Sequence, residues 1–169
     1  ATLTGIQKID NAKAPFRLGV IGEFRAGKST LINALLGSEI AFVDILEATP
    51  VECVFSFGNS CEAIIHSVDG KRSIVSIEDA NELISDRRDD DEWKESIDYI
   101  EYKVASNRLQ NFDLWDAPGM GGSDSNQFVA DKFLGKLGAA IWVLDATLLG
   151  KATITEALRR LRDDGKPVH

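Results

Sequence analysis

The sequence predicts an α/β fold: a three-layer sandwich whose mostly parallel sheet contains one antiparallel hairpin. Short apolar runs that are typical of buried strands alternate with segments whose apolar residues recur at helical spacing. The run at 18–21 passes through a glycine-bearing G-x-x-x-x-G-K-S loop into a helical pattern that ends before Gly37, a common helix-capping residue. Lys166-Pro167-Val168 reads as the first residues of another strand, so we expect the sheet to be incomplete at its C-terminal edge.

The other elements follow from the same two periodicities. Asp69-Gly70 predicts a tight turn between two strands, and Ser76 with Asp79 resembles a capping box that begins a helix. The run at 139–144 is the most apolar, so we expect this strand near the centre of the sheet. The predicted strands are 51–57 and 61–68 (joined as a hairpin), 72–75, 97–105 and 111–115, and the predicted helices are 77–87, 127–137 and 153–162.

Length and composition bound the class of protein. The 169 residues, 44% of them hydrophobic, suffice for one compact domain at 15–169 after a polar lead-in segment at 1–14. The net charge of −8, without any basic block, argues against a nucleic-acid partner and against electrostatic docking of this part on anionic lipid. The acidic cluster at 86–92 is predicted to be a solvated loop. Cys53 and Cys61, on neighbouring predicted strands, are expected to be free thiols in a cytoplasmic protein.

The loop after the first strand has the composition of a phosphate-binding loop, so the predicted three-layer sandwich is of the P-loop NTPase kind. Its two glycines let the backbone curl so that successive N–H groups point at a polyphosphate, and the helix N-terminus adds its positive dipole end. Lys28 would then reach the β- and γ-phosphates, and the Ser29 hydroxyl would bind Mg²⁺. The predicted nucleotide-binding residues of this loop are Gly22, Glu23, Phe24, Arg25, Ala26, Gly27, Lys28, Ser29 and Thr30.

A second motif, Asp116-Ala117-Pro118-Gly119, follows the strand at 111–115. An aspartate in this place can hold Mg²⁺ through water, and the N–H of Gly119 can sense the γ-phosphate. Thr49 stands between the first helix and the next strand, where its place resembles that of the threonine with which translational GTPases contact Mg²⁺ and the γ-phosphate. The alternative is a hydroxyl before a proline in an ordinary turn. Ser29, Thr49 and Asp116 are the predicted metal ligands, directly or through water.

Together, the segments GEFRAGKSTLINALLG, LWDAPGMGG and AAIWVLDAT, with the threonine at 49, resemble the dynamin superfamily, especially bacterial dynamin-like proteins. The resemblance extends over residues 15–169 as the N-terminal part of a GTPase domain. It implies GTP as substrate, GDP as product, Mg²⁺ as cofactor and a homodimer across the nucleotide face. For the complete protein it implies hydrolysis-coupled assembly, membrane remodelling and a peripheral position at the inner face of the membrane.

Three departures from the family pattern bear on catalysis and specificity. Arg25 stands where dynamins proper have serine, whereas guanylate-binding proteins and atlastins use an arginine there as an internal arginine finger; the alternative is an arginine that only rests on phosphates. With Lys28 and Thr49 it is a candidate catalytic residue. Met120 occupies the place of the water-positioning glutamine of Ras-like GTPases and cannot orient water. The guanine-selecting N/T-K-x-D motif would follow the strand that begins at 166–168, so guanine is implied by the resemblance alone.

Two other functions fit part of the pattern. An Era-like or ribosome-assembly GTPase shares the phosphate loop and the D-x-P-G motif, but such proteins usually append basic RNA-binding modules. A nucleotide-gated binding module with negligible turnover would fit Met120 and the incomplete sheet. Hydrolysis that depends on Arg25 and on protein concentration would favour the enzyme.

Overall fold

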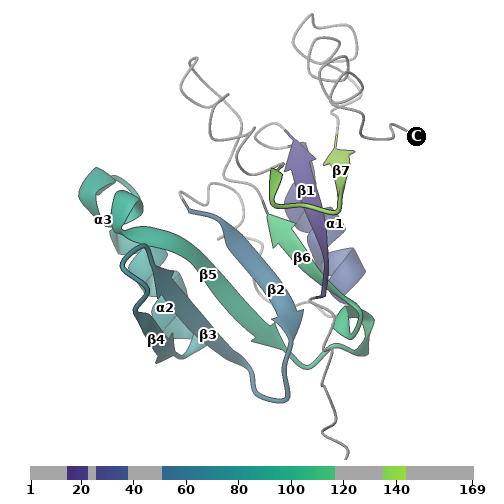
Figure 1. Cartoon of the computed structure of the whole chain (residues 1–169), viewed down its shortest axis with the longest axis horizontal. Helices are drawn as coiled ribbons and strands as arrows, with labels where there is room; N and C mark the ends of the chain where they lie inside the picture. Colours follow the sequence, from purple (N-terminus) through teal and green to yellow (C-terminus); the bar gives the residue numbers. More distant parts are fainter. Residues whose placement is uncertain (1–14, 23–25, 38–50, 117–134, 144–169) are drawn as a thin grey trace, which may run out of the picture.

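The computed structural model describes residues 15–22, 26–37, 51–116 and 135–143 (Figure 1). The strands are β1 (Phe16–Gly22), β2 (Cys53–Phe57), β3 (Glu62–Ser67), β4 (Arg72–Val75), β5 (Ile97–Val104), β6 (Phe112–Asp116) and β7 (Ala139–Val143). The helices are α1 (Lys28–Leu36), α2 (Ile77–Asp86), α3 (Asp91–Ser96) and the short 3₁₀ helix η1 (Asn107–Leu109). The predicted lead-in at 1–14, the helix predicted at 153–162 and most of the one predicted at 127–137 lie outside the described residues.

The strands form one mixed sheet in the order β4-β3-β5-β2-β6-β1-β7, which confirms the predicted α/β class. β1 lies between β6 and β7 and runs parallel to both. On the side of β6 away from β1, the sheet contains more antiparallel pairs than the one predicted hairpin. β2 is antiparallel to β6 and parallel to β5, and β3 is antiparallel to both β5 and β4. The predicted turn between β3 and β4 is confirmed, with Gly70 at a φ of 84° and its N–H donating to Ser67 O at 2.9 Å.

The hairpin predicted from 51–57 and 61–68 is wrong, because β5 lies between β2 and β3. β5 pairs in parallel with the whole of β2 and antiparallel with β3. The ring of Tyr102 on β5 stacks on that of Phe55 on β2, with centroids 5.4 Å apart and both side chains buried. The turn after β2 fixes only the direction of the returning chain, whereas burial of these aromatic side chains favours β5 as the neighbour.

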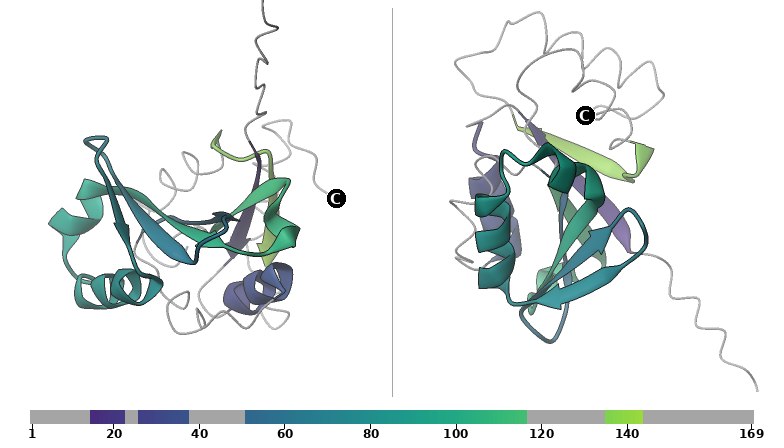
Figure 2. Two further views of the ribbon diagram at one scale, coloured as in Figure 1. Left: turned by 90° about the horizontal axis from the view of Figure 1, so that it is seen from below. Right: turned by 90° about the vertical axis from the view of Figure 1, so that its left-hand side faces the viewer.

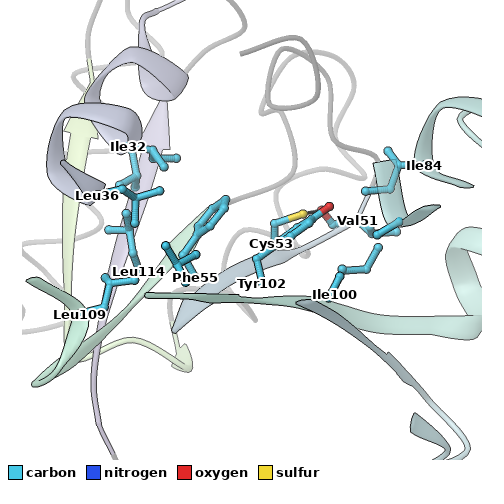
Figure 3. Close-up of a cluster of buried hydrophobic side chains, with 14 of the residues drawn as sticks. Ile32, Leu36, Val51, Cys53, Phe55, Ile84, Ile100, Tyr102, Leu109 and Leu114 are labelled. Carbon is cyan, nitrogen blue, oxygen red and sulfur yellow. Dashed lines mark hydrogen bonds between the residues drawn. The ribbon is translucent and has the colours of Figure 1, made fainter. Parts of the chain in front are cut away.

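The main core lies between one face of the sheet and the helices α1 and α2, which both cover that face (Figure 2). Successive strand residues point to opposite faces, so Leu114 of β6 belongs to this core, and the adjacent Trp115 belongs to a smaller cluster on the other face. Ile32 and Leu36 of α1 and Ile84 of α2 contribute to the main core from the helical side (Figure 3). The structure thus describes two of the three predicted layers.

The central place expected for the run at 139–144 is wrong, because β7 is the outermost strand of the described sheet. Among the described strands it pairs with β1 alone, and Ala139 and Ala140 are exposed. The apolar composition of a strand therefore does not fix its place in the strand order. Among the described strands, β7 therefore lies at the edge at which the sequence predicts an incomplete sheet.

The helix boundaries follow from capping side chains. The hydroxyl of Ser76 accepts the N–H of Asp79 at 3.0 Å, so α2 begins as the capping pattern predicts. The cluster at 86–92 is mostly exposed as predicted, but it is not a loop throughout, because its two ends belong to α2 and α3. Asp90 starts the second of these helices by accepting the N–H of Trp93 at 3.0 Å.

Candidate phosphate-binding site

Three parallel strands end at the same edge of the sheet, beside the N-terminus of α1 (Figure 1). β1 ends at Gly22, which is paired with Val143 of β7, and β6 ends at Asp116, which is paired with Val20. Ligands of open α/β sheets bind outside the carboxyl ends of the parallel strands. The fold therefore brings the strand before the phosphate loop and the aspartate of the second motif to one edge.

The two motif glycines are required for different physical reasons. Gly27, directly before α1, has a φ of 95°, in the left-handed region, and a Cβ added to it would meet nothing within 4 Å. Its role is conformational. Gly22 is required for close approach instead, because an added Cβ would lie 2.5 Å from the carbonyl oxygen of Val143. The loop is thus held tightly against β7 at its start and turns sharply at its end.

The N-terminus of α1 is suited to an anion. Its cap residue, Gly27, has no side chain to accept a hydrogen bond, and the first turn contains no acidic residue. The first backbone N–H groups of a helix have no partner within the helix, and they carry its positive dipole end. Ser29 is partly buried and Thr30 is exposed in this first turn. Both hydroxyls therefore lie at the end of α1 to which an anion would bind.

Lys28 and Asp116 are buried together at this edge. Only 7% of Lys28 is exposed, and Asp116 is fully buried. Nζ of Lys28 donates to the carbonyl oxygen of Gly22 at 3.1 Å, so the side chain folds back along the start of the loop. Burial lowers the pKa of Lys28, and the negative charge of Asp116 acts in the opposite direction. The arrangement holds a cation and a carboxylate within mutual electrostatic reach beside the helix N-terminus.

The structure brings together one part of the predicted site and leaves another part outside the described residues. Gly22, Ala26, Gly27, Lys28, Ser29, Thr30 and Asp116 belong to the first part. The second part consists of Glu23, Phe24, Arg25, Thr49 and Gly119, whose proposed roles stay predictions.

The described ligands fit magnesium bound together with a nucleotide. Within the described ranges no group of three or more His, Cys, Asp or Glu side chains could hold a metal ion by itself. The Ser29 hydroxyl and the Asp116 carboxylate offer oxygen atoms, which Mg²⁺ prefers as ligands, and the ion commonly completes its shell with water and phosphate oxygens. Two such oxygen groups fit a cation that is held jointly by the protein and a polyphosphate.

Cys53 is a neighbour of the site that the motifs did not reveal. Because β2 runs antiparallel to β6, its first residue is paired with Asp116. Burial raises the pKa of the Cys53 thiol well above its ordinary value, and the charges of Asp116 and Glu52 act in the same direction. A neutral, small group is therefore placed beside the aspartate. As predicted, Cys53 and Cys61 are both free thiols, although their segments are not adjacent in the sheet.

Comparison with known proteins places these features in a family. Residues 18–168 match the family model described as the Dynamin family. A bacterial dynamin-like protein of Nostoc punctiforme is 25% identical over 148 residues, covering 78% of this chain and 20% of the relative. The isoniazid-induced protein IniC of Mycobacterium tuberculosis is 40% identical over 63 residues, covering 37% of this chain and 13% of the relative. The chain therefore spans a fifth or less of the length of these relatives.

A solved structure shares the fold. It is described as an oligomerised bacterial dynamin pair that provides a mechanism for the long-range sensing and tethering of membranes. The TM-score is 0.59 at 21% sequence identity, and the match covers 76% of this chain and 20% of that chain. The family model extends over nearly the whole sequence, including both motifs that meet at the edge of the sheet. The chain therefore belongs to the dynamin family, a family of P-loop GTPases.

Proposed function

We propose that this chain is the nucleotide-binding part of a GTPase domain and that GTP binds where β1, β6 and β7 end. The observation that carries the proposal is the burial of Lys28 and Asp116 together beside the uncapped N-terminus of α1. The helix N-terminus and the ammonium group suit phosphate, and the carboxylate suits a metal bound to that phosphate. The domain would comprise residues 15–169 as its N-terminal part, with 1–14 as a lead-in.

Nucleotide binding would exchange one partner of Lys28 for another. Its Nζ donates to the carbonyl oxygen of Gly22 in the structure, and the β- and γ-phosphate oxygens would take this donor in charge-assisted hydrogen bonds, which are stronger than the neutral kind. Ser29 and Asp116 would hold Mg²⁺, which when bound neutralises charge on the phosphates. Water would attack the γ-phosphate, with Arg25 stabilising the transferring group and Thr49 contacting the metal.

For the complete protein we propose that hydrolysis is coupled to assembly and membrane remodelling. A homodimer across the nucleotide face would bring the loops of two copies together. The description of the structural relative, an oligomerised pair that tethers membranes, supports this proposal. In the described part of the chain, no helix is long and apolar enough to cross a bilayer. We propose a cytoplasmic protein that reaches the inner face of the membrane through other regions.

Binding of fluorescent GTP, GDP and ATP analogues to the intact protein, with and without Mg²⁺, tests the proposal. Lys28→Ala should weaken GTP binding by more than about tenfold, because a charge-assisted contact to phosphate is lost. Asp116→Asn should reduce the dependence of binding on Mg²⁺. The matched control is Lys94→Ala, since Lys94 forms its ion pair with Asp91 on α3, remote from β1. Unchanged binding by Lys28→Ala would refute the site, and equal binding of ATP and GTP would refute guanine specificity.

A nucleotide-gated binding module with negligible turnover is the second candidate, and Met120 in place of a water-positioning glutamine favours it. Turnover per molecule at rising protein concentration separates the two functions. An enzyme completed by its dimer should accelerate with concentration and slow down on Arg25→Ala, whereas a binding module should show flat, negligible turnover in both proteins. An Era-like function is disfavoured by the dynamin match over residues 18–168 and the net charge of −8.

A further inference from the structure

The C-terminal end of α1 is held by the connector between β5 and β6. The hydroxyl of Ser106 donates to the carbonyl oxygen of Leu36 at 2.7 Å, and Nη1 of Arg108 donates to that of Ala34 at 2.8 Å. The last four carbonyls of a helix have no partner within it. Two of these four are therefore bound by side chains that lie 70 and 74 residues further along the sequence.

Arg108 also supplies the charge that this end of the helix lacks. The last turn of α1 contains no basic residue, and the C-terminus of a helix carries its negative dipole end. Gly37, which caps α1 in the left-handed conformation, allows the guanidinium to come close, because a Cβ there would lie 2.8 Å from Nε of Arg108. The glycine is thus needed for its conformation and for the approach of the arginine.

The same connector leads directly to the aspartate of the site. Leu109 of η1 is 1% exposed and packs in the cluster that contains Leu36 of α1 and Leu114 of β6 (Figure 3). β6 then ends at Asp116, beside Lys28 at the other end of α1. One continuous segment therefore contacts α1 at its C-terminus and provides the carboxylate at its N-terminus.

We propose that Ser106 and Arg108 are positioning residues for the phosphate site, in addition to the nucleotide-binding function proposed above, on which this inference rests. By binding the last carbonyls of α1, they fix the helix along its axis relative to β6. Lys28 and Ser29, in the first turn, then keep their places relative to Asp116. α1 has nine residues and is about 13 Å long, so a packed helix of this length transmits a shift at one end to the other.

The test measures the affinities of the intact protein for fluorescent GTP and GDP analogues, at saturating and at zero Mg²⁺, below the melting temperature of every variant. The variants are Ser106→Ala, Arg108→Ala and Arg108→Lys. Two controls remove comparable contacts elsewhere. Ser76→Ala removes the cap of α2, and Arg87→Ala removes an exposed arginine whose Nη1 pairs with Asp90 Oδ2 at 2.8 Å. Lys28→Ala in the same series reports whether nucleotide binds at the proposed site.

A positioning role predicts that Arg108→Ala and Ser106→Ala weaken nucleotide binding about three- to tenfold, the range expected for loss of one hydrogen bond. The concentration of Mg²⁺ needed for tight binding should rise with them, and Arg108→Lys should restore part of the affinity because its charge still faces the helix end. The controls should lower only the melting temperature. Wild-type affinity in both alanine variants, alongside loss in Lys28→Ala, would overturn this inference alone. Absence of binding by the wild type would overturn the proposed function as well.

Discussion

Two glycines permit a matched test of what the phosphate loop requires from its backbone. Gly27 and Gly70 have φ values of 95° and 84°, and a Cβ added to either meets nothing within 4 Å. Gly27 precedes α1 at the proposed site, whereas Gly70 lies in the turn between β3 and β4. Alanine at each position therefore introduces the same backbone strain without a steric clash, once at the proposed site and once away from it.

The expected loss of stability is the same for both substitutions. An L-residue in the left-handed region costs about 1–2 kcal/mol, so Gly27→Ala and Gly70→Ala should lower the free energy of unfolding by this amount. Only Gly27→Ala should also weaken nucleotide binding, because relaxation of its φ redirects the first N–H groups of α1. Gly22→Ala is different in kind. Its Cβ would press on the Val143 carbonyl 2.5 Å away, and the forced shift of β7 or the loop should cost about 1–3 kcal/mol.

The assay combines urea unfolding, followed by tryptophan fluorescence, with titration of a fluorescent nucleotide for each variant. Loss of nucleotide affinity in Gly70→Ala as large as in Gly27→Ala would contradict a backbone requirement that is specific to the phosphate loop. Unchanged stability and affinity in Gly22→Ala would show that the close approach to β7 carries no energetic penalty.

Three other predictions concern the sheet. Phe55→Ala should lower the free energy of unfolding by about 3–5 kcal/mol in urea, because Phe55 is fully buried against Tyr102. Lys136→Ala should cost about 1–3 kcal/mol, since its Nζ donates to Glu52 Oε2 at 2.8 Å in a largely buried pair; exchanging the two residues should restore part of the loss. Burial raises the pKa of Glu101, but hydrogen bonds and the charge of its neighbours outweigh this, so the pKa is below its ordinary value. The stability that Glu101 contributes is therefore fully present above its unfolded pKa of 4.5, and it is lost as the pH falls through the lower folded pKa. The difference in unfolding free energy between wild type and Glu101→Gln should therefore shrink on acidification.

The local signals in the sequence predicted the elements well. The capping hydroxyl of Ser76 and the Asp69-Gly70 turn act within a few residues, so their effects can be read without knowing the rest of the fold. The same holds for the phosphate loop, whose strand, glycines and helix are contiguous. The charged cluster at 86–92 is ambiguous in the sequence, because a contiguous run of charge is compatible with both a loop and the capped start of a helix. The hydrogen bond from the Trp93 N–H to Asp90 shows that a helix begins there.

Pairing between distant strands could not be predicted in this way. A turn of three residues suggested that β2 and β3 are neighbours, whereas β5, which follows about thirty residues after β3, pairs with both. The apolar character of β7 likewise suggested a central place, although β7 is outermost among the described strands. Strand order depends on how all the strands and helices pack together, so it cannot be inferred from one strand and its adjacent turn.

By itself, the sequence determined the chemistry of this protein: the strand, glycine loop and helix that suit a polyphosphate, and the aspartate of a second motif. Only the tertiary structure showed that Lys28 and Asp116 are both buried within electrostatic reach of each other, that Gly22 is needed for contact with β7, and that Ser106 and Arg108 hold the far end of α1. The reason is that motif chemistry is set by neighbours along the chain. Burial, electrostatic reach and long-range capping arise only when segments far apart in sequence pack together.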